Sequence, residues 1–65
     1  MNVTYDVGVD VLRIVFSDRP IAESAENKPG VILDYAADGS LVGVEILNAS
    51  EHVSSPNSIK YTVFR

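Results

Sequence analysis

The sequence contains no cysteine and only one histidine, which removes two common means of stabilising or equipping a small protein. Without cysteine the chain forms neither a disulfide framework nor a thiolate metal site, and one histidine excludes a His-rich metal cluster. No apolar run approaches the roughly 20 residues that a membrane-spanning helix requires. We therefore expect a cytoplasmic protein that uses no metal and no cofactor and does not enter a membrane.

Basic residues are also few: five lysines and arginines stand against nine acidic residues, for a net charge of -4. They are scattered along the sequence and form no stripe. Phosphate contacts from clustered basic side chains supply most non-specific nucleic-acid affinity, so we expect no nucleic-acid binding by this chain alone. An acidic chain is better suited to a small basic protein partner.

The chain of 65 residues is short enough to form one domain over 1–65. A chain of this size buries only about 60% of the surface that its unfolded form exposes. Because disulfides are excluded and no metal cage is visible, oligomerisation is the remaining way to bury more apolar surface. The size of the chain therefore predicts a homodimer.

Two apolar runs flank the dipeptide Asp38-Gly39, which is a strong signal for a β-hairpin over 30–47. A two-residue loop at this dipeptide, or a four-residue loop over 36–39, keeps the apolar side chains on one face. The expected pairs are Val31 with Ile46, Leu33 with Val44, and Tyr35 with Val42. A three-residue loop with a glycine bulge would turn one apolar set over, so it is not expected. Gly43, inside the second strand, indicates a bulge or a close approach of two backbones.

A second hairpin is predicted over residues 2–17, where Val3 pairs with Ile14 and Tyr5 with Leu12. Its turn covers 7–10 or Gly8-Val9 alone, with Gly8 supplying the positive φ that such turns often need.

The remaining segments give weaker signals. Residues 18–29 contain a short edge strand over 21–24 or a single helical turn over 22–27, or they form a mobile loop, and these alternatives stay open. One helical turn over 51–53, capped by Ser50, follows the central hairpin. Residues 59–64 alternate again and predict a last strand whose place in the sheet is open. The predicted fold is mainly β: a small antiparallel sheet of two hairpins plus a C-terminal strand, with at most one short helical turn, in a dimer.

Carboxylates are the main candidates for chemistry. Asp34 and Glu45 are expected near each other on the polar face of the central hairpin, with Arg13 as a partner across the sheet or a dimer contact. Such a pair suits acid–base chemistry or a hard divalent cation, but a solvated structural role is favoured. Coverage of the apolar neighbours of Glu45 by a subunit would raise its pKa. The carboxylates at turns are expected to bond nearby backbone amides: Asp6, Asp10 and Asp38.

No catalytic constellation is apparent elsewhere. Ser50 and His52 lie two residues apart without a serine elbow or oxyanion glycines, so a cap and a surface histidine are the favoured interpretation. The glycines do not form a phosphate-binding loop, because no glycine-rich turn opens a helix. We therefore do not expect an enzyme.

Several short motifs recur in an order that resembles a known family. They are Tyr5-Asp6, Asp10-Val11-Leu12-Arg13-Ile14, Pro29 to Tyr35, Asp38-Gly39, Leu41 to Leu47, and Ala49-Ser50. Together they resemble the small bacterial family catalogued as domain of unknown function 2283, over residues 3 to 50. Arg13 stands where that family often has an aromatic residue, and Val7 where it often has proline. The resemblance implies a short, mostly cytoplasmic bacterial protein and carries no activity with it.

Three functional hypotheses follow. The first is a non-enzymatic, homodimeric protein-interaction module. The second is an antitoxin-like regulator that binds a small basic toxin, because some members of the similar family look like neighbours of toxin-like proteins. The third is a divalent-metal or carboxylate-dependent enzyme that uses Glu45 and Asp34.

Overall fold

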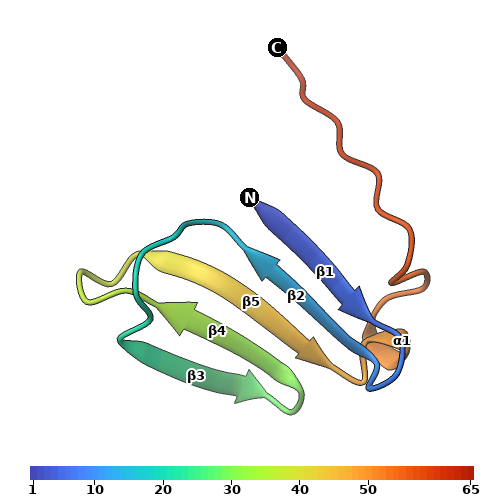
Figure 1. Ribbon diagram of the computed structural model, residues 1–65, viewed down its shortest axis with the longest axis horizontal. Helices are drawn as coiled ribbons and strands as arrows, with labels where there is room; N and C mark the ends of the chain where they lie inside the picture. The colour runs from blue at the N-terminus through green and yellow to red at the C-terminus, as the bar shows by residue number, and fades with distance from the viewer.

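The computed structural model describes residues 1–65 as one open antiparallel sheet with a short helix at one end (Figure 1). The strands and the helix are β1 (Asn2–Asp6), β2 (Val11–Val15), β3 (Glu23–Lys28), β4 (Val31–Tyr35), β5 (Leu41–Leu47) and α1 (Ala49–His52). Their spatial order, β1-β2-β5-β4-β3, leaves β1 and β3 at the two open edges. The mainly β antiparallel fold predicted from the sequence is confirmed. The protein has no helix that is long and apolar enough to cross a membrane.

The first hairpin has the predicted register, since Tyr5 pairs with Leu12 and Val3 with Ile14. The turn occupies residues 7–10, which is the longer of the two predicted turns. The predicted positive φ at Gly8 is wrong, because Asp10 takes that conformation, with a φ of 57°. The carboxylate of Asp6 accepts the backbone N–H of Gly8 at 2.9 Å and holds the start of the turn. The turn therefore needs no left-handed residue until its last position.

The central hairpin keeps the predicted pairing of its apolar residues, but its loop differs from the predicted one and a bulge compensates for the difference. Val31 pairs with Ile46 and Leu33 with Val44, as predicted, whereas Tyr35 pairs with Leu41 and not with Val42. The loop is of the three-residue type that the sequence argument rejected: Ala36 N–H donates to Ser40, and Gly39, at φ 85°, donates to Ala36. A register shift between Asp34 and Tyr35 leaves one extra residue in β5. That bulge reverses the displacement caused by the loop, so the apolar set stays on one face.

Gly43 lies directly beside this bulge, and it confirms the prediction of close backbone approach. A Cβ atom built on Gly43 would lie 2.7 Å from the carbonyl oxygen of Ile14 in the neighbouring strand β2. Any side chain here would force the backbones of β2 and β5 apart. Glycine is therefore required for the two halves of the sheet to join.

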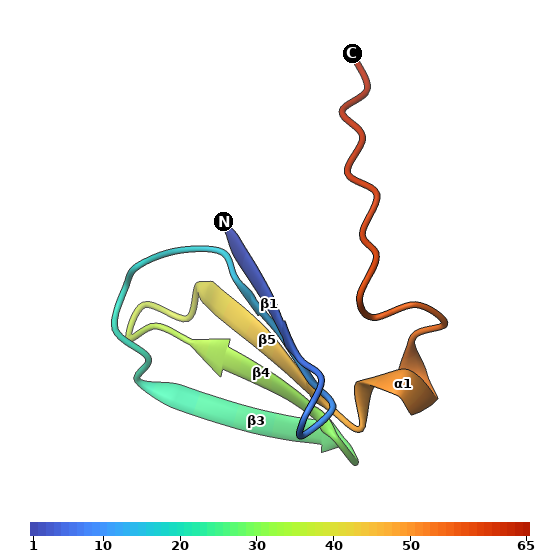
Figure 2. The ribbon, with the colours of Figure 1, turned by 45° about the vertical axis from the view of Figure 1, so that its right-hand side comes forward.

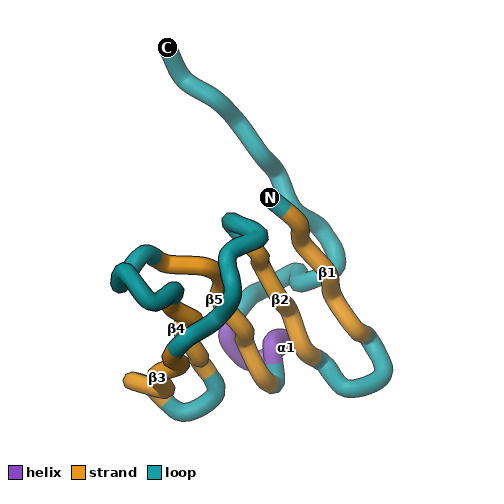
Figure 3. The backbone as a smooth tube through the Cα atoms, turned by 60° about the vertical axis from the view of Figure 1, so that its left-hand side comes forward, coloured by secondary structure: helices purple, strands orange, loops and turns teal.

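The connection from β2 to β3 runs past the ends of β5 and β4, so that β2 to β5 form a Greek-key arrangement (Figure 3). The backbone N–H of Ala22 donates to Tyr35 at 2.8 Å and brings the chain into the sheet. β3 then runs along β4, which resolves the three alternatives for 18–29 in favour of an edge strand. This strand begins two residues later than the predicted start at 21 and ends just before Pro29, which cannot donate to a ladder.

The helical turn after β5 is confirmed, but its predicted cap is wrong. The N-cap of α1 is Asn48, whose φ of 51° turns the chain out of β5, and its side chain makes no capping hydrogen bond. Ser50 lies inside the helix instead. Asparagine tolerates the left-handed conformation better than most residues, so the sharp turn falls on Asn48.

The predicted strand over 59–64 is not formed within the chain. Residues 59–65, here called the C-terminal arm, are extended, stand clear of the sheet and make no backbone hydrogen bond (Figure 2). The physical reason is that α1 directs the chain out of the plane of the sheet. Strand pairing needs a neighbour about 4.8 Å away in that plane.

The sheet has two distinct faces, and neither encloses a large core. Strand parity defines an apolar face made of Val3, Tyr5, Leu12, Ile14, Ala25, Val31, Leu33, Val44 and Ile46. The opposite, carboxylate face contains Thr4, Val11, Arg13, Val15, Ser24, Ile32, Asp34, Gly43, Glu45 and Leu47. Of the apolar face only Leu12 is buried; the other buried hydrophobic residues are Ala36, Val42 and Ala49.

Candidate functional site

The carboxylate pair predicted from the sequence is brought together by strand pairing. Asp34 in β4 lies opposite Gly43 in β5, and Glu45 follows two residues later in β5 on the same face. Ser24 in β3 pairs with Asp34 from the other side, and its hydroxyl donates a 2.6 Å hydrogen bond to Asp34 Oδ1. The absence of a side chain at Gly43 leaves room on this face for the two carboxyl groups to approach each other.

Asp34 is the most unusual residue of the pair because it is only 2% exposed. One of its two carboxylate oxygens is satisfied by Ser24, whereas Oδ2 is buried and has no hydrogen-bond partner. Leaving a buried charged oxygen unpaired is costly, so a proton donor is expected beside it.

Glu45, which lies on the same face, is the neighbouring carboxyl group with a shifted pKa. Burial is the main cause that raises the pKa of Glu45, and a hydrogen bond to Asp34 and the negative charge of Asp34 raise it further. Arg13, which pairs with Glu45 across β2 and β5, acts in the opposite direction and lowers it. A hydrogen bond between two carboxyl groups requires a shared proton, so the neighbouring Asp34 makes the carboxyl group of Glu45 harder to ionise. The pKa is raised within the single chain, without the subunit contact that the sequence argument invoked.

The chemistry available to this pair is limited by its surroundings. No group of three or more histidine, cysteine, aspartate or glutamate side chains is arranged to hold a metal ion. The polar groups next to the pair are a hydroxyl, from Ser24, and an exposed guanidinium, from Arg13. The arrangement places two carboxyl groups on one partly covered face of the sheet, where burial raises the pKa of Glu45.

Asp10 belongs to a second cluster, which links the two ends of the family-like motif pattern. The hydroxyl of Tyr5 donates to Asp10 Oδ1 at 2.6 Å, and the hydroxyl of Ser50 donates to Oδ2 at 2.6 Å. The backbone N–H of Ser50 points to the same carboxylate, and that of Ala49 donates to the Asp10 carbonyl at 2.9 Å. The first hairpin turn is thus tied to α1.

These contacts perturb both titrating groups of the cluster. The hydrogen bond from Ser50, followed by that from Tyr5, lowers the pKa of Asp10, and the same Asp10 contact raises the pKa of Tyr5. The prediction that Asp10 bonds a nearby backbone amide is wrong, because its carboxylate accepts the N–H of Ser50, and the sequence did not predict this link. The one available signal was that Tyr5, Asp10 and Ser50 all fall in the recurring motifs.

The other singled-out turn residues have structural roles. Asp38 accepts hydrogen bonds from the backbone and the hydroxyl of Ser40 and pairs with Arg19 Nη1 at 2.5 Å. The bonds from Ser40 are the main cause that lowers the pKa of Asp38 to about 2. Both members of the ion pair are more than half exposed, so its contribution to stability is small. Asp6 and Asp38 therefore lie outside the carboxylate pair.

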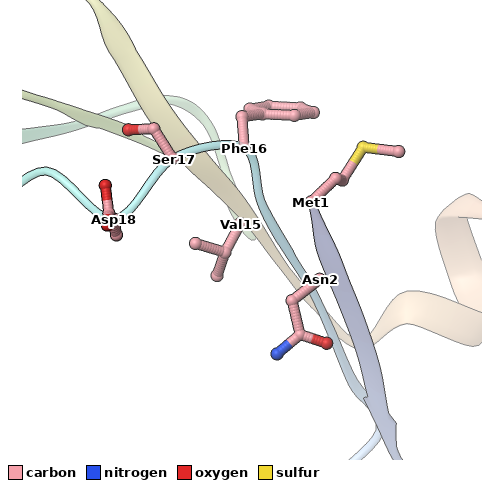
Figure 4. Close-up of a pocket in the computed structure, with 6 residues that line it drawn as sticks. All are labelled: Met1, Asn2, Val15, Phe16, Ser17 and Asp18. Atoms are coloured by element: carbon pink, nitrogen blue, oxygen red, sulfur yellow. The ribbon is translucent and has the colours of Figure 1, made fainter.

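The surface has three open hollows, and neither Asp34 nor Glu45 lines any of them. The largest, of about 530 Å³, is lined by Met1, Asn2, Val15, Phe16, Ser17 and Asp18 (Figure 4). Met1 and Phe16 point to one side of the chain, while Asn2 and Val15 point to the other, so no set of polar groups converges there. A second hollow, of about 340 Å³, lies between the apolar-face residues Val3 and Tyr5 and the segment that contains Pro56 and Ile59.

Comparison with known proteins agrees with the motif pattern. A family model described as "Protein of unknown function (DUF2283)" matches residues 2–50, which confirms the resemblance identified from the sequence. The matched range contains the whole sheet, the carboxylate pair and the Tyr5–Asp10–Ser50 link, and it ends before the C-terminal arm. No curated protein and no solved structure matches the chain.

Proposed function

Because the chain belongs to the DUF2283 family, whose description names no activity, we propose its function from geometry alone: a non-enzymatic module that pairs with a second copy of itself through the apolar face. The single observation that supports this proposal is how little of the apolar face is covered. Val3 is 36% exposed, and the residues around the centre of the face, including Ile14, Leu33 and Val44, are only half-buried. Central strands of a complete antiparallel sheet normally bury one face fully.

The total exposed surface leads to the same conclusion. Surface scaling gives about 4,000 Å² for a folded protein of this mass, 7.0 kDa. The chain exposes 4944 Å². The excess of roughly 900 Å² is close to the ~800 Å² that each partner loses in a standard protein–protein interface. This surplus includes both the open apolar face and the exposed residues at the C-terminal end, such as Tyr61 and Phe64, and a second copy would cover part of each.

Two adjacent residues of β1 give a matched test. Val3 lies on the apolar face and Thr4 on the carboxylate face, and both are exposed in the single chain, so lysine fits at either position without disrupting the fold. We expect the wild-type chain to be dimeric in sedimentation equilibrium at about 100 µM, a concentration that detects even weak standard interfaces. Val3→Lys is expected to raise the dimer dissociation constant at least about tenfold, whereas Thr4→Lys leaves it unchanged.

Circular dichroism of both variants verifies that the sheet is intact. A wild-type chain that sediments as a monomer, or equal effects of the two substitutions, would contradict the proposal.

The carboxylate pair supports a second candidate, a carboxylate-dependent role of Asp34 and Glu45. The observation that favours it is the buried, unpartnered Oδ2 of Asp34. Calorimetric titration with Mg²⁺, Mn²⁺ and Ca²⁺ tests it, with the nearly isosteric variant Asp34→Asn as the control. Heat of binding that is present in the wild type and lost in the variant would support a cation site. The absence of heat for all three ions would contradict such a site.

A further inference from the structure

The C-terminal arm has the pattern of a strand but no partner strand in its own chain. Ile59, Tyr61 and Val63 alternate with Lys60, Thr62 and Phe64, and the three odd-numbered residues are 57%, 73% and 65% exposed. No backbone N–H or C=O group of residues 59–65 forms a hydrogen bond with another backbone group. An alternating apolar segment with a free backbone is typical of peptides that bind by adding a strand to a sheet.

The same structure contains an open sheet edge of matching length. β1 pairs with β2 on one side only, so the backbone groups on its other side are free. β1 has five residues, and the alternating part of the arm, 59–64, has a similar length. Free edges of this kind are normally covered or blocked in natural proteins.

The arm does not reach its own β1 edge. The hollow of about 340 Å³ separates Ile59 and Pro56 from Val3 and Tyr5, so the arm leaves on the apolar-face side of the sheet. Figure 2 shows it standing away from β1 along its whole length, and exposure rises to 90% at Phe64. A copy packed on the apolar face would lie on the side to which the arm extends.

Charge favours another copy of this chain as the partner. Residues 1–58 contain nine acidic and three basic residues, which gives 3 - 9 = -6, whereas the arm contains Lys60 and Arg65 and no acidic residue, which gives +2. The two values add to the net charge of -4 for the whole chain. A basic arm is therefore attracted to an acidic sheet, and Asp6 at the end of β1 is one of the acidic groups.

We propose that the C-terminal arm of each copy pairs as a strand with the β1 edge of a second copy, and that the exchange is reciprocal in a twofold dimer. The inference rests on the proposed function, since it describes how the pair of apolar faces is closed. Pairing would place Ile59, Tyr61 and Val63 on the same face as Val3 and Tyr5, which extends the apolar surface in contact. Because each arm occupies one β1 edge, the reciprocal exchange leaves neither β1 edge free, and the arm exchange closes on itself at two copies.

The first test compares the full chain with a chain that lacks residues 59–65. The deleted residues lie outside the sheet and outside the family match, so the sheet is expected to fold, as circular dichroism verifies. The deletion is expected to raise the dimer dissociation constant at least about tenfold in sedimentation equilibrium. The matched point variants are Tyr61→Lys, which is expected to weaken the dimer, and Thr62→Lys, which is expected not to, because strand pairing distinguishes the two parities.

The second test locates the arm. Since the chain contains no cysteine, Thr4→Cys in one copy and Thr62→Cys in a tagged second copy form a defined pair. We expect a disulfide between the tagged and untagged chains under mild oxidation. In a chain carrying both substitutions, the expected product is a covalent dimer and not an intrachain disulfide.

The outcomes separate this inference from the proposed function. A dimer whose dissociation constant is unchanged by the deletion overturns the arm exchange but leaves the face-to-face dimer standing. An intrachain disulfide in the double variant also overturns the exchange, because it shows the arm closing on its own β1. A full chain that is monomeric overturns both proposals.

Discussion

The contact at Gly43 makes the sharpest prediction about stability, because the space for a side chain is absent and the obstacle is backbone. A Cβ added there would lie 2.7 Å from the Ile14 carbonyl oxygen and 3.5 Å from the Cα of Val15. Side-chain carbons do not approach other atoms as closely as the first of these distances. β2 would have to move away from β5 by several tenths of an ångström, and both strands are fixed by their other pairs. The sheet therefore cannot relax at this point without weakening the pairing of β2 with β5.

Gly43→Ala is expected to destabilise the chain by about 1–3 kcal/mol, the usual cost of overpacking. For a domain of this size each kcal/mol corresponds to a melting-temperature shift of about 4–8 °C. Thermal and urea unfolding followed by circular dichroism measure the effect. Gly8→Ala is the control, because its Cβ would meet only a side-chain oxygen of Asp6 at 3.3 Å and no positive φ is required. A free energy of unfolding for Gly43→Ala within about 0.5 kcal/mol of wild type would refute the packing argument.

Two further predictions concern the titrating clusters. The raised pKa of Glu45 means that the folded chain holds its proton more tightly than the unfolded chain, so this contribution is present at low pH and is lost as pH rises through the folded pKa. Glu45→Gln places an uncharged amide donor next to Asp34 at every pH, so it is expected to remove that loss of stability. Urea unfolding should therefore show the variant to be more stable than wild type at about pH 8 but not at about pH 4. Equal differences at both pH values would contradict this prediction. The lowered pKa of Asp10 has the opposite sign, since its stabilisation is present above the unfolded pKa and is lost as pH falls through the folded one. Ser50→Ala removes the largest cause of that shift, so it is expected to lower the melting temperature at neutral pH and to reduce its fall on acidification, whereas an unchanged acid profile would show that the link to α1 carries no free energy.

The sequence predicted the faces of the sheet better than the details of its turns. Alternation of apolar residues fixed the partners of Leu33 and Val31, because a slip by one residue would expose every apolar side chain of a strand. The loop type was wrong, since the parity argument assumed an uninterrupted ladder. The three-residue loop shifts the strand pairing by one residue, and the extra residue next to Gly43 shifts it back. A bulge is difficult to predict from the local sequence, although Gly43 did indicate its position.

The candidate site was predicted where it depends on neighbouring strands and missed where it depends on distant segments. Asp34 and Glu45 belong to one hairpin, so their proximity followed from its register. The contact between Asp10 and Ser50 joins residues that are 40 positions apart, and no pattern in either segment points to the other. The strand over 59–64 failed for a related reason. Alternating apolar residues indicate that a segment can form a strand, but they do not indicate which strand it can pair with.

The bulge in β5 also has a consequence for shape. Where β5 runs along β4, the six residues from Leu41 to Ile46 lie opposite the five residues from Val31 to Tyr35, so the paired segments differ in length. A sheet accommodates such a difference by bending and by twisting more strongly at that point. A flat surface cannot rest on both halves of a coiled sheet at once. Any partner that packs against the apolar face therefore has to follow this bend.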